Sequence, residues 1–148
     1  MVEIDVRYLG GLRCEATHGP SGQTLITDAP QDNHGKGEFF SPTDLVVTAM
    51  GTCVFTIMGI CAEREGIPLQ GARVRVSKTM SSDAPRRIAR CEMVFEMPRG
   101  IRPEHRGMLE RIVKTCPVQA SLKPEVEIRV VFHWDSDRSA AEDGPLRR

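Results

Sequence analysis

The sequence predicts an α+β fold, with antiparallel sheets around one buried central helix. Residues of alternating polarity fall into two groups, and an 18-residue stretch without charge, 45–62, separates them. Strand groups interrupted by helices are typical of α+β domains. A length of 148 residues corresponds to one domain. We expect that domain at residues 1–134 and a disordered polar tail at residues 135–148.

The first group of strands occupies the N-terminal 28 residues. Apolar and polar residues alternate over 2–8, 12–17 and 23–28, which predicts three strands that each expose one side to solvent. Gly10-Gly11 and the Gly-Pro-Ser-Gly segment at 19–22 are turn sequences. We therefore expect an antiparallel meander. A loop over residues 29–40 follows it, and loops of this length in compact domains are often functional.

The central helix has start and stop signals of its own. Ser41 is a suitable N-cap, Pro42 suits the first helical position, and Asp44 suits the third position of a capping box. Gly66 and Pro68 then predict its end. Apolar residues occur on every side of this helix, so we expect it to be buried all round. Because one small chain cannot easily bury such a helix, the pattern predicts a tight homodimer.

The same stretch meets the minimum length of a transmembrane helix. Five small or polar residues dilute it: Thr48, Gly51, Thr52, Thr56 and Gly59. Aromatic residues do not flank it as they flank membrane spans. We therefore expect a buried helix of a globular domain and no membrane partner.

The second group of strands follows the central helix. Alternation predicts these strands at 72–77, 90–97 and 125–134. Between the last two, Pro103 opens a second helix with an apolar stripe that ends near Cys116. Pro117 interrupts this helix and starts a short third helix that runs through Leu122.

Composition excludes several classes of function. Twenty basic and twenty acidic residues give zero formal net charge, so we expect no nucleic-acid partner. Five cysteines without C-x-x-C or zinc spacing argue against a disulfide framework and against a metal site. The acidic, alternating N-terminus is unlike a secretory signal. We therefore expect a cytoplasmic protein without cofactor or metal.

Two segments, each with one cysteine, carry a family resemblance. One is Ser41-Pro42-Thr43-Asp44-Leu45 with Ala49, Gly51 and Cys53, and the other is Cys116-Pro117-Val118-Gln119-Ala120-Ser121-Leu122-Lys123. With the cysteines 63 residues apart and this strand order, they resemble the OsmC/Ohr family (osmotically inducible protein C and organic hydroperoxide resistance proteins). The resemblance covers roughly Val2 to Trp134. It implies an OsmC-like fold, an intertwined homodimer and active sites at the subunit interface.

The resemblance implies thiol-dependent reduction of hydroperoxides, preferably organic ones. Cys53 matches the peroxidatic cysteine of the family and Cys116 the resolving one. A Cys53 thiolate would become a sulfenic acid, Cys116 would condense with it to a disulfide, and an external dithiol would reduce that disulfide. Cys116 stands before Pro117 at a helix start, where backbone N–H groups favour a thiolate.

The sequence departs from the family pattern in the groups that support the thiolate. In the peroxidases of the family, an arginine and a glutamate support the thiolate of the peroxidatic cysteine. The position of that glutamate is Thr43 in this sequence, and a threonine cannot form an ion pair with an arginine. Asp44 is better interpreted as the capping-box acid. A thiol in apolar surroundings needs a nearby cation to ionise. The candidates, in order of chemical suitability, are Arg13, Lys36 and His34, although alternation places Arg13 on the solvent side of its strand.

Two functions therefore remain open. The first is a peroxidase that uses Cys53 and Cys116. The alternative is an OsmC-like protein without peroxidase activity, which binds an apolar small molecule at the dimer interface or acts as a thiol redox sensor. The remaining thiols, Cys14, Cys91 and Cys61, are expected to be structural.

Overall fold

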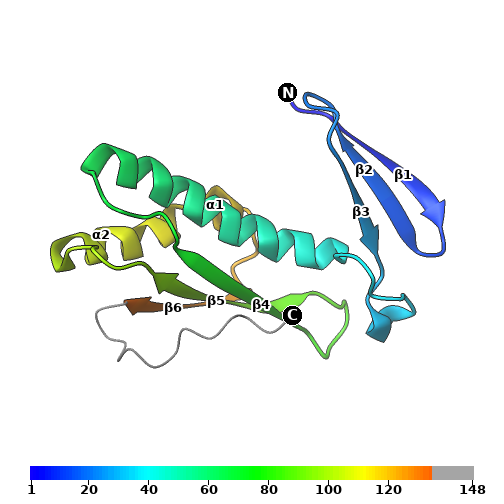
Figure 1. The fold of residues 1–148 in the computed structure, drawn as a ribbon. Coiled ribbons are helices and arrows are strands. Elements are labelled where there is room, and N and C mark those ends of the chain that lie inside the picture. The colour runs from blue at the N-terminus through cyan, green and yellow to red at the C-terminus, as the bar shows by residue number, and fades with distance from the viewer. Residues whose placement is uncertain (135–148) are drawn as a thin grey trace. The chain divides into compact units, whose positions relative to one another are not determined.

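The computed structural model describes residues 1–134 (Figure 1). The tail expected at 135–148 lies outside the described residues. The chain forms two compact units, Met1–Val46 and Val47–Arg148. The elements follow the order β1-β2-β3-η1-α1-β4-β5-α2-η2-α3-β6, which confirms the α+β class.

The first unit contains a three-stranded antiparallel sheet, as predicted. Strands β1 (Ile4–Gly10), β2 (Arg13–His18) and β3 (Thr24–Asp28) pair in the order β1-β2-β3. Large apolar side chains on β1 are more than half exposed; they are Ile4, Val6 and Tyr8. None of the three strands contributes a residue to the buried hydrophobic core. The sheet therefore presents an apolar face that a single chain leaves uncovered.

The loop after β3 is tied down by its own backbone. It contains one 3₁₀ turn, η1 (Gln31–Asn33), and the Gly35 N–H donates to the Pro30 carbonyl at 3.1 Å. A Cβ on Gly35 would lie 1.7 Å from the carbonyl oxygen of Ala29, so the loop requires glycine at this position. This compact loop leads directly to the start of the central helix.

Helix α1 (Pro42–Glu65) begins and ends at the predicted signals. The Asp44 N–H donates to Ser41 Oγ at 3.1 Å, and the Ser41 N–H donates back to Asp44 Oδ2 at 2.7 Å, which completes the predicted capping box. At the other end Gly66 has φ +65°, and the Ile67 N–H donates to the Ala62 carbonyl at 2.9 Å. This bond is the long hydrogen bond of a Schellman motif.

The burial of α1 is one-sided in a single chain. Its buried residues follow helical spacing: Val47, Met50, Gly51, Val54, Met58 and Ala62. Ile60, by contrast, is 65% exposed. We expected burial on every side, and one chain provides it only on the face that packs on β4 and β5. By length and composition α1 could also cross a membrane, but its buried face belongs to the hydrophobic core of the second unit.

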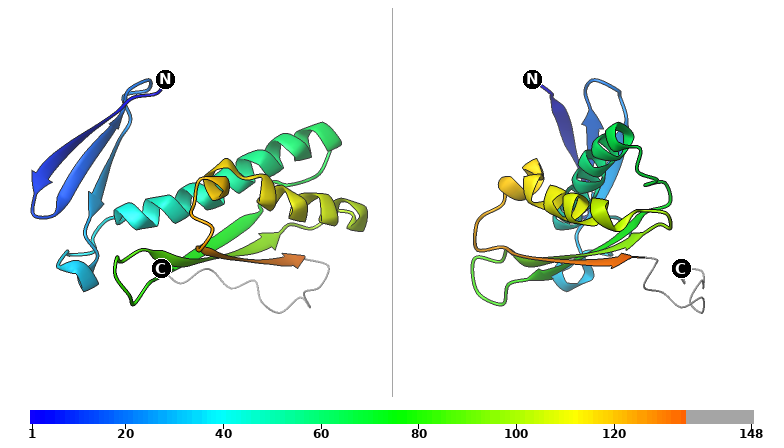
Figure 2. Two further views of the ribbon diagram at one scale, coloured as in Figure 1. Left: turned by 180° about the vertical axis from the view of Figure 1, so that it is seen from behind. Right: turned by 90° about the vertical axis from the view of Figure 1, so that its left-hand side faces the viewer.

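The second unit contains a three-stranded sheet with helices on one face (Figure 2). Strands β4 (Arg73–Met80), β5 (Ile88–Met97) and β6 (Glu127–Trp134) pair in the order β4-β5-β6. The β4–β5 pair is antiparallel, but β5 and β6 run parallel. The expectation of purely antiparallel sheets is wrong for this pair, because the chain crosses over through helices before it returns as β6.

The crossover contains α2 (Pro103–Ile112), η2 (Val113–Thr115) and α3 (Pro117–Ala120). The predicted second helix therefore ends as a 3₁₀ turn before Cys116. Beneath the helices, Phe95 stacks on Phe132 with ring centroids 4.7 Å apart, and Phe55 of α1 meets Phe95 edge-on at 5.5 Å. These contacts pack α1 and β6 against the same central strand.

Candidate functional site

Cys53 lies near the middle of α1 and is half-buried. It is adjacent in sequence to the fully buried Val54 and packs against the core of the second unit. Two residues earlier, Gly51 faces β4 so closely that an added Cβ would lie 2.8 Å from Cγ2 of Val76. Glycine therefore allows α1 to approach the sheet at the turn that carries Cys53.

Cys116 is completely buried and caps the short helix α3 from its N-terminal side. The Cys53 thiol lies near the Cys116 thiol and raises its pKa. Two backbone N–H groups of the same turn, from Gln119 and Val118, lie near the sulfur of Cys116 and lower its pKa. The structure thus brings the two family-matched cysteines together, with one sulfur half-buried and the other enclosed.

The Cys116 thiol favours its protonated form in this site. Burial raises the pKa of Cys116, the N–H groups of Gln119 and Val118 lower it, and the neighbouring Cys53 raises it further, so that the net shift is upward. From the sequence we expected the helix start to favour a thiolate. The N–H groups are present as expected, but desolvation is the larger effect.

The other three cysteines have surroundings of their own. Cys91 is fully buried in β5, and burial raises the pKa of its thiol to about 11, as suits an inert core residue. Cys61 contacts the sulfur of Met108 at 3.7 Å. Cys14 is half-buried on β2. Among residues 1–134, no group of three or more His, Cys, Asp or Glu could hold a metal ion.

Arg13 is held by two carboxylates within the first unit. Its Nη2 contacts Asp28 Oδ2 at 3.5 Å and also a carboxylate oxygen of Glu38. Its guanidinium carbon lies 5.1 Å from the centroid of the Phe39 ring. The side chain is 26% exposed. It is therefore a positioned cation, whereas alternation alone predicted a solvated one.

Asp28 organises this arrangement from a fully buried position. Its Oδ2 accepts the Glu38 N–H at 3.1 Å, and its own N–H donates to the Phe40 carbonyl at 3.1 Å. The N–H group of Glu38 lowers the pKa of the Asp28 carboxyl, and Arg13 lowers it further, although burial opposes both. Asp28 thus fixes both ends of the short segment 38–40 and the arginine beside it.

The other predicted support residues have different surroundings. Asp44 is occupied by the capping box of α1, and Thr43 Oγ1 lies 3.1 Å from Ser41 Oγ. Both His34 and Lys36 are exposed on the loop, and His34 has a left-handed backbone with φ +64°. Thr43 and Asp44 therefore serve the helix start.

Sequence reasoning missed Asp28 and Glu38. A register argument would have found Asp28, because a hairpin turn at 19–22 pairs residue 13 with residue 28, as the structure does. Glu38 lies in irregular backbone, where no period relates it to Arg13. Its contact depends on the path of the loop.

Comparison with known proteins supports the family resemblance. Residues 35–131 match the model of the OsmC-like protein family. A candidate osmotic-stress-induced and detoxification response protein from Psychrobacter arcticus 273-4 is 38% identical, with a TM-score of 0.85 over 90% of this chain and 96% of that chain. No protein of curated function matches the chain.

Two organic hydroperoxide resistance proteins share the fold at 12% identity. The OsmC protein from Legionella pneumophila has a TM-score of 0.73 over 90% of this chain and 97% of its own. The protein from Elizabethkingia anophelis has a TM-score of 0.72 over 89% of this chain and 94% of its own. At such identity the likeness concerns the fold alone.

Proposed function

The chain belongs to the OsmC-like protein family, and from that membership we propose that it is a thiol-dependent peroxidase that reduces organic hydroperoxides. The proximity of the Cys53 and Cys116 thiols, by which Cys53 raises the pKa of Cys116, carries this proposal. A sulfenic acid–disulfide cycle requires two neighbouring thiols, and here one is half-buried and the other is enclosed.

The proposed cycle has three steps. The Cys53 thiolate attacks the terminal oxygen of the hydroperoxide, so that the O–O bond breaks, an alcohol leaves and Cys53 becomes a sulfenic acid. The Cys116 thiol then attacks the Cys53 sulfur, a disulfide forms and water leaves. An external dithiol reduces this disulfide and is itself oxidised to a disulfide. Apolar side chains near Cys53 favour an organic substrate.

We further propose Arg13 as the cation that supports the Cys53 thiolate, from the same or the partner subunit. A guanidinium is permanently charged and offers a fork of donors. Glu38 and Asp28 hold it, a task that the family pattern gives to a glutamate at the position of Thr43. Lys36 and His34 are the less suitable alternatives, because both side chains are exposed on the loop.

The working protein in this proposal is a cytoplasmic homodimer. A second copy would cover the exposed apolar side of the sheet β1-β2-β3 and the exposed side of α1, where Ile60 lies. All five cysteines are free in the structure, and a reducing compartment would keep them so.

Turnover with a dithiol tests the peroxidase. We expect multiple turnovers of cumene hydroperoxide with dithiothreitol and slower turnover of hydrogen peroxide. Cys53→Ser should abolish both reactions, whereas Cys61→Ser, a change at a half-buried cysteine of the same helix, should leave them intact. Equal turnover in Cys53→Ser and wild type would refute the proposal.

A second measurement tests the supporting cation. The rate of Cys53 alkylation is followed against pH in wild type and in Arg13→Ala, with Lys36→Ala and His34→Ala as parallel variants. We expect Arg13→Ala to move the midpoint of this profile to higher pH and the loop variants to leave it in place. If none of the three substitutions shifts the pH profile of Cys53 alkylation, then none of these side chains supports the Cys53 thiolate.

A thiol redox sensor is the second candidate. Its supporting observation is that Thr43 and Asp44 are engaged at the start of α1, so the family's carboxylate support is absent there. A sensor would form the Cys53–Cys116 disulfide once with organic hydroperoxide and show no sustained turnover with dithiol.

A further inference from the structure

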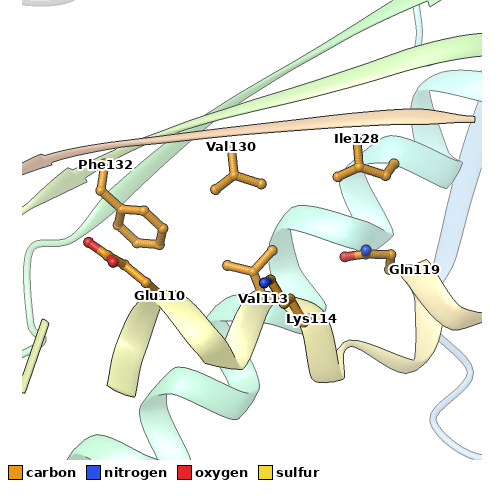
Figure 3. A pocket seen from close by; sticks show the side chains of 7 residues that line it. All are labelled: Glu110, Val113, Lys114, Gln119, Ile128, Val130 and Phe132. Carbon is orange, nitrogen blue, oxygen red and sulfur yellow. The ribbon is translucent and has the colours of Figure 1, made fainter. Parts of the chain in front are cut away.

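A cavity lies in the second unit, between the crossover helices and strand β6 (Figure 3). Its volume is about 410 Å³, which is within the range of small-molecule sites. Seven residues line it: Glu110, Val113, Lys114, Gln119, Ile128, Val130 and Phe132. Neither Cys53 nor Cys116 is among them.

The helices cover strand β6 incompletely at this cavity. Ile128, Val130 and Phe132 share the strand face that points at the helices (Figure 3). Ile128 and Phe132 are half-buried, yet Val130 between them is 36% exposed. An inward-facing valine with that exposure is only partly covered by the side chains of the described residues. An apolar ligand would cover it.

The polar lining specifies the rest of the ligand. The Oε1 of Gln119 is buried, and no donor within residues 1–134 reaches it. A buried acceptor without a partner is unfavourable, so a ligand that donates an N–H to it gains affinity. Glu110 and Lys114, one helical turn apart, line the same cavity with opposite charges. Their charges cancel, which favours a neutral polar group over an ion.

We propose that this cavity is a binding site for a small neutral amphipathic molecule, with an apolar body on Val130 and an amide-type N–H donor to Gln119. Gln119 belongs to the short helix α3 that Cys116 caps, so a bound ligand would contact the turn that carries the second thiol. The proposal does not depend on peroxide chemistry.

The test uses two probes of matched length on the reduced, ¹⁵N-labelled full chain. Hexanamide carries N–H donors, and methyl hexanoate carries none. In titrations followed by NMR, hexanamide should shift the backbone amides of Val113, Gln119 and Val130. It should bind up to about tenfold more tightly than the ester, since one neutral hydrogen bond contributes up to about that factor. Absence of these shifts would overturn the proposal. A second subunit that covers the cavity would also prevent binding, and this result would overturn the proposal in the same way.

Three variants sharpen the result. Val130→Trp should fill the cavity and abolish binding of both probes, whereas Val131→Trp, one residue along at a position 42% exposed and outside the lining, should retain it. Gln119→Leu should remove the preference for the amide while leaving ester binding unchanged. Equal binding by the two tryptophan variants would overturn the site. If Val130→Trp does not fold, Gln119→Leu decides, and a preserved amide preference there would overturn the site.

Discussion

Replacement of Gly51 by alanine should destabilise the protein, although alanine is the better helix former. Gly51 lies in the middle of α1 on its buried face. Alanine instead of glycine in a helix interior is worth about 0.8–1.0 kcal/mol. The added Cβ, however, would lie 2.8 Å from Val76 Cγ2 and 3.4 Å from Val74 Cγ1. Overpacking of a close-packed core costs about 1–3 kcal/mol, so we expect a net loss of up to about 2 kcal/mol.

Gly59 of the same helix provides the matched control. A Cβ at Gly59 would meet no atom within 4 Å, so Gly59→Ala should stabilise the protein by about 1 kcal/mol. Helix propensity is common to both variants, and the difference between them isolates the contact with β4. That difference should be about 1–3 kcal/mol.

Urea unfolding at one protein concentration measures both variants. Equal m-values would allow the midpoints to be compared as free energies of unfolding. If Gly51→Ala is as stable as Gly59→Ala, then α1 does not approach β4 as closely as the structure shows, and the packing that positions Cys53 is incorrect.

Three further predictions follow from local geometry. Ser41→Ala should lower the free energy of unfolding by about 1 kcal/mol in urea titrations, since it removes the acceptor for the Asp44 N–H; no change would show that the cap is unimportant. The pKa of Asp28 is lowered from 3.8 in the folded chain, so its stabilisation is present above that value and is lost as pH falls through the lower folded pKa. Wild type should therefore begin to lose its stability advantage over Asp28→Asn below about pH 5 and lose more of it as the pH falls below 3.8, measured by urea unfolding, and a constant difference would contradict the assigned contacts. Cys116→Ser should leave a sulfenic acid on Cys53 after one equivalent of organic hydroperoxide, detected as a dimedone adduct by mass spectrometry, whereas wild type should form the disulfide; an adduct of equal yield in both would exclude Cys116 as the resolving thiol.

Features that depend on neighbours in sequence were predictable. Alternation located all six strands to within a few residues, since side chains of a strand point in turn to opposite sides. The capping box of Ser41 and Asp44 and the stop at Gly66 were also predictable, because each involves atoms only a few residues apart. The two cysteines were identified through their flanking residues, and the structure places their thiols near each other.

Features that depend on distant segments came only from the tertiary structure. The parallel pairing of β5 with β6 follows from the path of the crossover, which local alternation does not encode. The position of Arg13 depends on hairpin register and on where the loop places Glu38. For Cys116 the sequence determined which N–H groups lie near the sulfur, but the balance of effects on its pKa depended on burial. Burial is a property of all the surrounding elements together, and so only the folded chain decides it.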